Sequence, residues 1–209
     1  WLKYISPHPK DFTDSVIKAI AENPKVARML HLPQQSGSTK ILGAMNRGYT
    51  KEEFIELALK IKKEIPDIGI TTDIIVGFPG ETDEDFQDTL DVVNEVGFEN
   101  AYMFSYSKRT GTPAATMEDQ VDEDVKTERL QQLIQLQNTR TKKESTRYLN
   151  ETVKVLVDGP SRKNKEMLSG RTSTHKIVLF KGDKELIGKF VNIKINETKT
   201  WTLYGEIAE

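Results

Sequence analysis

The chain of 209 residues contains no cysteine, so it forms no disulfide and offers no thiolate to a zinc site or an iron–sulfur cluster. No apolar run approaches the roughly 20 residues that a membrane-spanning helix needs. The three histidines, His8, His31 and His175, lie far apart and form no cluster with metal-ligand spacing. We therefore expect a chain that binds no metal by itself, uses no thiol chemistry and does not enter a membrane.

Common catalytic signatures are missing as well. The chain has no Walker loop, no G-x-G-x-x-G, no H-E-x-x-H and no G-x-S-x-G motif. Its 36% hydrophobic and 30% charged residues are typical of a soluble globular protein. The chain opens on Trp1, within a strand-like stretch, and this predicts a piece of a longer protein.

The net charge of −2 conceals an asymmetry along the chain. Residues 1–146 carry 18 lysines and arginines against 24 aspartates and glutamates, a net charge of −6. Residues 147–209 carry 12 against 8, a net charge of +4. A basic module behind an acidic one favours contact with a polyanion, while an ordinary solvated surface remains the alternative.

Three apolar runs each change abruptly into a polar segment rich in glycine or proline. These segments are HLPQQSGS at residues 31–38, IIVGFPGET at 74–82 and YSKRTGTP at 106–113. The order of strand, polar loop and helix predicts part of a parallel β/α barrel, like half of a TIM barrel. The strand ends of such a fold converge on one face, so we expect Gln35, Asp73, Gly77 and Ser107 to lie close together.

The predicted strand at 68–76 has two different faces. Ile68, Ile70, Ile74 and Val76 share one face and are expected to pack under helices. Asp73 lies on the opposite face, which is expected to look into a barrel or cleft. The other predicted strands of this part are 28–32 and 101–107.

A change of pattern predicts a second domain. Residues 122–147 form a long polar helical pattern, which indicates a connector. After Tyr148 short segments alternate with period two, as at 153–157, 176–180, 190–195 and 201–207. We therefore predict a small antiparallel β-barrel at 147–209 behind a β/α domain at 1–146.

Two glycine-containing loops are candidate binding segments. Gly77 and Gly80 leave room for a ligand to approach the backbone, although a plain strand-to-helix turn explains them equally. Residues 34–38, QQSGS, supply donors and acceptors suited to a ribose or an amino-acid head group. Ser38 also fits the cap of a following helix, and the two interpretations are compatible.

Charged side chains near these loops leave alternatives open. Arg47 suits a carboxylate clamp or a solvated surface. Asp73 and Glu81 suit hydroxyl or amine recognition, and a structural partner such as a neighbouring arginine is the alternative for Asp73. Lys108 and Arg109 follow a strand and suit phosphate or nucleic acid, or a plain solvent loop.

The second domain carries cations that we place on its loops. They are Arg162, Lys163, Lys165 and Arg171. Small barrels bind nucleic acid through basic, loop-flanked surfaces. Because few aromatic residues lie among these cations, contact with the phosphate backbone is favoured over base stacking.

Taken together in this order and spacing, the motifs resemble the radical S-adenosylmethionine methylthiotransferase family, and the tRNA-modifying branch most closely. The resemblance rests on SPHP at 6–9, residues 31–38, MNRGYT at 45–50, DIIVGFPGET at 73–82, YSKRTGTPA at 106–114, SRK at 161–163 and LSGRT at 168–172. It covers nearly the whole chain. It implies the later half of a radical SAM barrel followed by an RNA-binding TRAM domain.

The resemblance also implies the chemistry of the parent protein. Such enzymes use S-adenosylmethionine and two [4Fe–4S] clusters held by cysteines, so this cysteine-free chain is expected to hold no cluster, to contain no catalytic residue of its own and to be inactive alone. The expected substrate is the isopentenyladenosine of a tRNA next to the anticodon, methylthiolated at C2. The expected location is the cytoplasm.

By resemblance, the cofactor residues fall in two groups. Gln35, Ser36, Ser38 and Arg47 line the ribose and methionine part, and Val76, Gly77 and Phe78 run along the adenine. Asp73 joins them, although a role toward substrate or structure stays open, as it does for Arg109. The expected RNA contacts are Lys108, Arg109, Arg162, Lys163, Lys165 and Arg171.

Other functions stay open beside this one. Within the family, the alternative modifies an aspartate of a ribosomal protein. A non-catalytic RNA-binding module, or a different half-barrel enzyme with a phosphorylated substrate at residues 77–82, are further alternatives. Because an incomplete barrel exposes strand edges, we also expect self-association of the chain.

Overall fold

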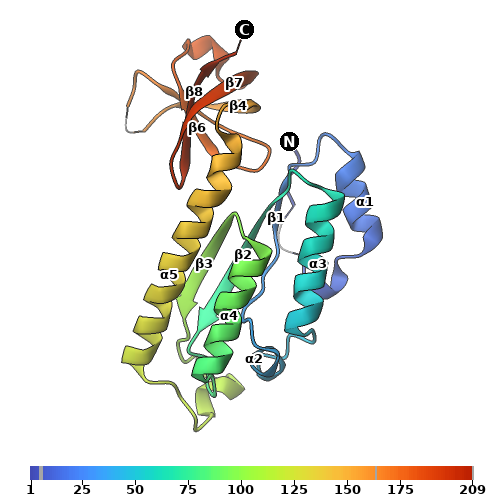
Figure 1. Cartoon of the computed structure of the whole chain (residues 1–209), viewed down its shortest axis with the longest axis vertical. Helices are drawn as coiled ribbons and strands as arrows, with labels where there is room; N and C mark the ends of the chain where they lie inside the picture. The colour runs from blue at the N-terminus through green and yellow to red at the C-terminus, as the bar shows by residue number, and fades with distance from the viewer. Residues whose placement is uncertain (5–6, 163, 209) are drawn as a thin grey trace. The chain divides into compact units, whose positions relative to one another are not determined.

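The structure, a computed structural model, describes residues 1–4, 7–162 and 164–208, and within them the chain divides into two compact units (Figure 1). The first, here called the β/α unit, comprises Tyr4–Asn23 and Leu30–Arg140. The second, the barrel unit, comprises Trp1–Lys3, Pro24–Met29 and Thr141–Glu209. The boundary near residue 141 lies close to the predicted one, and two short N-terminal segments group with the barrel.

The β/α unit is built on a sheet with strand order β1–β2–β3. Its strands are β1 (Met29–His31), β2 (Gly69–Val76) and β3 (Asn100–Ser105). Strands β2 and β3 are parallel, with Thr71 opposite Asn100 and Val76 opposite Ser105. The strands predicted at 28–32, 68–76 and 101–107 are thus confirmed, with ends that shift by one or two residues.

Helices follow the strands as the alternating pattern requires. They are α1 (Asp14–Glu22), α2 (Thr39–Ala44), α3 (Lys51–Glu64) and α4 (Asp83–Val96), with short 3-10 turns η1 (Pro9–Asp11) and η2 (Pro113–Thr116). Thr50 with Glu53 and Thr82 with Asp85 form capping boxes that satisfy the first backbone N–H groups of α3 and α4.

The two faces of β2 differ as the alternation of its residues predicts. Ile68, Ile70, Ile74 and Val76 are buried, together with Phe54 and Ile61 of α3 and Phe86 and Val93 of α4. On the opposite face Tyr102 and Phe104 of β3 are 52% and 54% exposed. These two side chains stand opposite Asp73 and Ile75 in the parallel register. The face that carries Asp73 is therefore open.

Helix α5 (Glu123–Ser145) is more than the connector that its polar sequence indicates. Its buried positions recur every three or four residues, but most are polar: Lys126, Arg129, Leu133, Gln137, Thr141 and Ser145. Lys126 packs on Gly77, and the Arg129 guanidinium lies over the Phe86 ring. The part of α5 up to Arg140 belongs to the β/α unit and packs against it. Its inward side chains hydrogen-bond to polar partners on other elements instead of entering an apolar core.

The barrel unit contains a closed barrel with strand order β4–β5–β6–β8–β7. The strands are β4 (Thr152–Pro160), β5 (Leu168–Arg171), β6 (Ile177–Phe180), β7 (Phe190–Thr198) and β8 (Thr202–Ile207); the short turns η3 (Thr146–Tyr148) and η4 (Lys184–Leu186) precede β4 and β7. Its core holds Val155, Val157, Val178, Phe180, Ile193, Ile195 and Leu203.

The predicted small barrel is confirmed, with two differences. Strands β6 and β8 pair in parallel, whereas an all-antiparallel barrel is expected from the sequence. The segment Leu168–Arg171 is a strand and not a loop, so Arg171 lies on β5. Its pattern is hidden because Gly170 stands where a Cβ would come within 2.5 Å of the Leu156 carbonyl oxygen on β4.

Within the described residues, no helix combines the length and the apolar character that crossing a membrane requires.

Candidate cofactor site

A pocket of about 800 Å³ lies beside the later parts of β2 and β3 and the loops that follow them, all within the β/α unit. Its volume is in the range that small-molecule cofactors occupy. The polar lining includes Gln35, Asn46, Arg47, Asp73, Ser107 and Arg109, and the apolar and aromatic lining includes Ile75, Phe78, Phe104 and Tyr106. The predicted convergence is confirmed for Gln35, Asp73 and Ser107, whereas Gly77, predicted to lie with them, does not line the pocket.

Gln35 reaches the pocket because its backbone extends the sheet beyond β1. Its N–H donates to the Asp73 carbonyl at 2.8 Å, and its own carbonyl accepts from the Ile75 N–H at 2.9 Å. Gln35 adopts the left-handed region, with φ of 71°. This backbone turn costs energy for a residue with a Cβ, and the two hydrogen bonds to β2 hold it in place.

The rest of the QSGS loop is fastened to the first turns of α4. The Gly37 N–H donates to the Thr89 hydroxyl at 2.9 Å. A Cβ on Gly37 would lie 2.3 Å from the Thr89 Cα, so only glycine lets the loop approach this close. The Ser38 hydroxyl accepts from the Ile41 N–H at 3.3 Å and so caps α2, as predicted.

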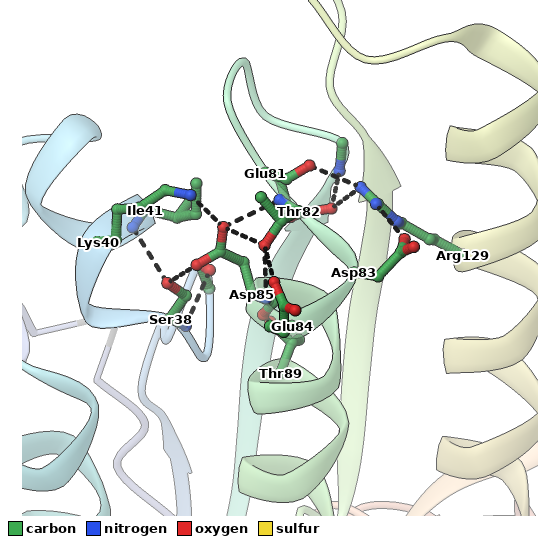
Figure 2. A network of polar contacts seen from close by, with 12 residues as sticks. Ser38, Lys40, Ile41, Glu81, Thr82, Asp83, Glu84, Asp85, Thr89 and Arg129 are labelled. Carbon is green, nitrogen blue, oxygen red and sulfur yellow. Dashed lines mark hydrogen bonds and ion pairs between the residues drawn. The ribbon is translucent and has the colours of Figure 1, made fainter.

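Asp85 connects this loop to the start of α4 (Figure 2). One carboxylate oxygen accepts from the Ser38 hydroxyl at 2.6 Å. The other accepts from Lys40 Nζ at 2.5 Å and from the Thr82 N–H at 2.9 Å. Burial opposes the charge of Asp85, but these donors outweigh it and lower the pKa of the carboxyl group to about 2.

The second glycine-containing loop is held by Glu81 and helix α5, as Figure 2 shows for Glu81 and Arg129. Glu81 Oε1 accepts from the Gly77 N–H at 2.8 Å and from Arg129 Nη1 at 2.9 Å. Arg129 Nη2 also donates to Asp83 at 2.7 Å. Burial raises the pKa of Glu81, while Gly77 and Arg129 oppose the rise. Glu81 therefore links the Gly77 loop to helix α5 through hydrogen bonds within the protein.

The space in front of Gly77 is filled by the chain itself. A Cβ on Gly77 would lie 2.3 Å from Cγ of Lys126, whose Nζ lies over the Tyr106 ring at 5.6 Å. A Cβ on Gly80 would lie 2.5 Å from Asp119 Oδ2. The room that the sequence suggests for a ligand at these two glycines is instead occupied by Lys126 and Asp119.

Arg47 lines the pocket and is partly restrained. Its Nε donates to the Tyr49 hydroxyl at 3.3 Å, and its guanidinium lies 5.7 Å from the Tyr49 ring centre. The Tyr49 hydroxyl lies 3.0 Å from the carbonyls of Pro33 and Gln34. Burial raises the pKa of Tyr49, so it stays protonated and ties the Arg47 turn to the QSGS loop.

The partner of Asp73 is a histidine, which the sequence does not single out. His31 Nε2 lies 3.2 Å from Asp73 Oδ2, and His31 Nδ1 lies 3.0 Å from the Thr71 hydroxyl. The pair joins β1 to β2 across 42 residues of sequence. An alternation of polar residues on the open sheet face is the one sequence signal that could have suggested this contact.

The sequence-predicted residues thus separate into two sets. Those brought together around the pocket are Gln35, Arg47, Asp73, Phe78 and Arg109. Ser36, Ser38 and Val76 are buried and do not line it, Gly77 faces Lys126, and Lys108 is exposed outside the lining.

The cations predicted in the second domain do not form one cluster on a loop. Arg162 and Lys165 are exposed between β4 and β5, and Lys163 lies outside the described residues. Arg171 lies on β5 and donates through Nε to Asp158 at 3.1 Å.

Two protein families match this chain. The Radical SAM superfamily matches residues 3–93, and the TRAM domain matches residues 146–208. In solved structures, coproporphyrinogen III oxidase from Escherichia coli, described as a radical SAM enzyme, covers 80% of this chain and 45% of its own with a TM-score of 0.55. At 14% identity that likeness shows the fold alone, and it agrees with the predicted partial barrel.

Relatives of known name match over almost the whole chain. The tRNA-2-methylthio-N(6)-dimethylallyladenosine synthase of Fusobacterium nucleatum is 62% identical over 206 residues, 99% of this chain and 47% of that relative. The enzyme of the same name from Acetivibrio thermocellus is 55% identical, over 99% of this chain and 43% of that relative. The chain spans about half the length of these relatives.

The Asp85 contacts predict a pH-dependent contribution to stability. Because folding lowers the pKa of Asp85 from 3.8 to about 2, the carboxylate stabilises the fold above pH 4, and this stabilisation is lost as the pH falls toward 2. Asp85→Asn should lower the free energy of unfolding at pH 7 by about 2 kcal/mol, with the deficit shrinking in acid. Denaturant titrations at a series of pH values measure this.

Asp88→Asn is the matched control on the same helix, because Asp88 pairs with Lys51 near the surface and should contribute less than about 1 kcal/mol. An equal effect of the two substitutions, or a deficit of Asp85→Asn that does not change with pH, would contradict the assignment.

The packing at Gly77 gives a second prediction. Gly77→Ala must adopt a φ near 73° and also displace Lys126, whereas Gly111→Ala at φ 85° meets no atom within 4 Å. We expect Gly111→Ala to cost about 1 kcal/mol in backbone strain and Gly77→Ala to cost about 1–3 kcal/mol more. Chemical denaturation of both variants measures these losses in the free energy of unfolding. Equal losses would show that the Lys126 side chain moves aside at no cost.

Proposed function

We propose that the chain belongs to the radical SAM methylthiotransferase family, and that it holds S-adenosylmethionine and contacts tRNA in an enzyme that methylthiolates adenosine. The observation that carries the proposal is the pocket that gathers Gln35 from the loop after β1, Arg47 from the loop after α2, and Asp73 and Phe78 from the end of β2 and the loop that follows it. The reaction is addition of a methylthio group to C2 of an isopentenyl-type adenosine next to the anticodon.

The chemistry of the pocket fits S-adenosylmethionine. The guanidinium groups of Arg47 and Arg109 suit a carboxylate, and Asp73 suits an ammonium or ribose hydroxyls. The rings of Phe78 and Tyr106 pack edge to face at 5.2 Å and offer apolar surface to an adenine. Among the described residues the buried Tyr106 hydroxyl has no hydrogen-bond partner, which leaves it available to a ligand.

We assign the predicted residues their roles on this basis. Gln35 and Arg47 bind the ribose and methionine part, and Phe78 contacts the adenine. Ser36, Ser38, Val76 and Gly77 contribute by backbone or by shaping the loops, because their side-chain positions are buried or occupied. Asp73 is held by His31 in the orientation that faces the pocket.

The iron–sulfur clusters of such an enzyme do not fit this chain. It has no cysteine, and the described residues hold no group of histidine and carboxylate side chains with the spacing of metal ligands. When bound beside a reduced cluster, S-adenosylmethionine supplies the radical chemistry of the family. We propose that both clusters are held by sequence outside these 209 residues and that the chain alone is inactive.

Transfer RNA is the proposed macromolecular partner. The TRAM domain and the names of the relatives favour it over a ribosomal protein. Exposed Arg162 and Lys165, with Arg171 on β5 and Arg109 and Lys108 after β3, supply charge for phosphate contacts. Lys163 lies beyond what the structure describes and stays a prediction from the sequence. With tRNA as its substrate, we propose a cytoplasmic location for the protein.

The cofactor assignment is tested in the full-length protein with its clusters in place. Asp73→Asn removes the negative charge proposed to face the ammonium or ribose and should weaken S-adenosylmethionine binding about tenfold or more. Equilibrium binding of S-adenosylmethionine and mass spectrometry of the modified tRNA measure the effect. Glu56→Gln on the exposed face of α3 is the control and should change neither. Unchanged binding in Asp73→Asn would remove Asp73 from the site.

Self-association of the isolated chain remains a prediction from its open sheet. Strands β1 and β3 are the edges of the sheet that the structure describes, and Tyr102 and Phe104 expose apolar rings beside one of them. We propose that two copies pair through β3. Light scattering should show dimers whose fraction rises with concentration and falls in Phe104→Lys, whereas a monomer at all concentrations would rule out the pairing.

A further inference from the structure

One outer face of the barrel combines residues that are remote in sequence. On β4 the side chains of Val155 and Val157 enter the core, so Leu156 between them points outward. Leu156 stands opposite Phe190 on β7 and opposite Arg171 on β5. Because directly paired residues project to the same side of a sheet, Phe190, Leu156 and Arg171 form a row across three strands.

The first residues of the chain lie on this same row. Leu2 forms a parallel bridge with Val26, and its N–H and carbonyl bond to Lys25 and Ala27 at 2.7 and 2.9 Å. Trp1 then packs edge to face on Phe190, with ring centres 4.8 Å apart. Lys3 Nζ reaches His175 Nδ1 at 2.5 Å. The segment Trp1–Lys3 therefore crosses from the β7 end of the row to the β5 end.

Positive charge is concentrated at the β5 end. Burial lowers the pKa of Lys3, and the nearby Arg171 lowers it further. Burial and then the charges of Arg171 and Lys3 lower the pKa of His175 to about 4, so its ring is neutral at pH 7. Since Lys3 can only donate, His175 Nδ1 accepts from it, and the ring proton lies on Nε2. Asp158 is the one carboxylate among these groups.

Aromatic surface is concentrated at the β7 end. Phe190 is 44% exposed although it packs edge to face against Trp1. Lys154, on the outer side of β4, holds its Nζ 4.8 Å from the Phe190 ring centre. A ring with a cation above it and an exposed flank is the arrangement on which nucleic-acid bases stack.

We propose that this composite face, formed by Trp1, Lys3, Lys154, Arg171, His175 and Phe190, binds a single-stranded segment of RNA. A base stacks at Phe190 and Trp1, and a neighbouring backbone phosphate binds Lys3 and Arg171. The inference deepens the proposed function, on which it rests, by locating one RNA contact and by adding residues from outside the TRAM domain. It also replaces pure backbone contact, favoured from the sequence, with a base contact.

A protein with an acidic or apolar surface is the other class of partner that could bind such a face. RNA is favoured because Lys154 lies over an exposed aromatic ring and the cations Lys3 and Arg171 lie on the same face. A phosphate there relieves the like-charge contact of Lys3 with Arg171, and it raises the pKa of His175.

The test measures binding of a single-stranded oligoadenylate RNA to the 209-residue chain as a function of salt. Phe190→Ala should weaken binding about tenfold without changing the slope of log affinity against log salt. Lys3→Gln should lower the magnitude of that slope by about 0.7, the value for one phosphate contact on a single strand. Phe190→Trp, which keeps a stacking ring, should restore binding and shows that the loss is not caused by unfolding.

Two matched controls lie elsewhere. Trp201→Ala removes another exposed ring of the barrel unit, 47% accessible, and Lys63→Gln removes a lysine of α3; both should bind RNA as the unchanged chain does. Binding by Phe190→Ala and Lys3→Gln at the unchanged affinity and slope overturns the inference and leaves tRNA as the proposed partner. If the unchanged chain binds no RNA, both the inference and the tRNA contact of the proposed function are wrong.

Discussion

The Asp85 carboxylate is the contact on which both loops around the pocket depend. It accepts hydrogen bonds from Ser38 and Lys40 on one loop and from Thr82 at the end of the other. Each donor belongs to a segment that would otherwise have to satisfy its polar groups in water. Because a buried carboxylate is costly unless it is hydrogen-bonded, these contacts stabilise the two loops in their positions against the start of α4.

Helix α5 is likewise held by buried polar contacts, to the loop that follows β2. Its inward face is largely polar, and the ion pair of Arg129 with Glu81 is almost completely buried. A buried pair of this kind adds little net stability, but the loss of one partner leaves the other charge uncompensated. The pair therefore specifies where α5 lies against the loop, while Leu133 and the stem of Lys126 supply the apolar contact.

Local patterns were enough to predict most of the helices and strands and the convergence of Gln35, Asp73 and Ser107. The alternation in β2 separates a buried face from an open one, and the capping residues Thr50 and Thr82 mark two helix starts. Strand β5 was missed because Gly170 lowers its strand signal for a packing reason that lies on β4. The inward face of α5 was missed because its partners are charges and backbone groups on other elements.

Contacts between residues that are far apart in the chain could not be predicted from the sequence alone. The pairing of His31 with Asp73 depends on the order of β1 and β2 in the sheet. The grouping of Trp1–Lys3 with the barrel depends on the bridge between Leu2 and Val26. Of the residues that the resemblance assigns to the cofactor, Gln35, Arg47, Asp73 and Phe78 line a pocket, whereas Ser38 and Gly77 are already engaged within the protein.

The fit of Gly37 against α4 has a consequence for the energetics of ligand entry. The Gly37 N–H meets the Thr89 hydroxyl, and the space beside its Cα is filled by main-chain atoms of the helix, which cannot rotate away as a side chain can. The loop has thus lost its conformational entropy during folding. The loop beside the pocket is therefore preorganised. Binding of a ligand does not have to pay the entropic cost of ordering this loop, so that cost does not lower the affinity.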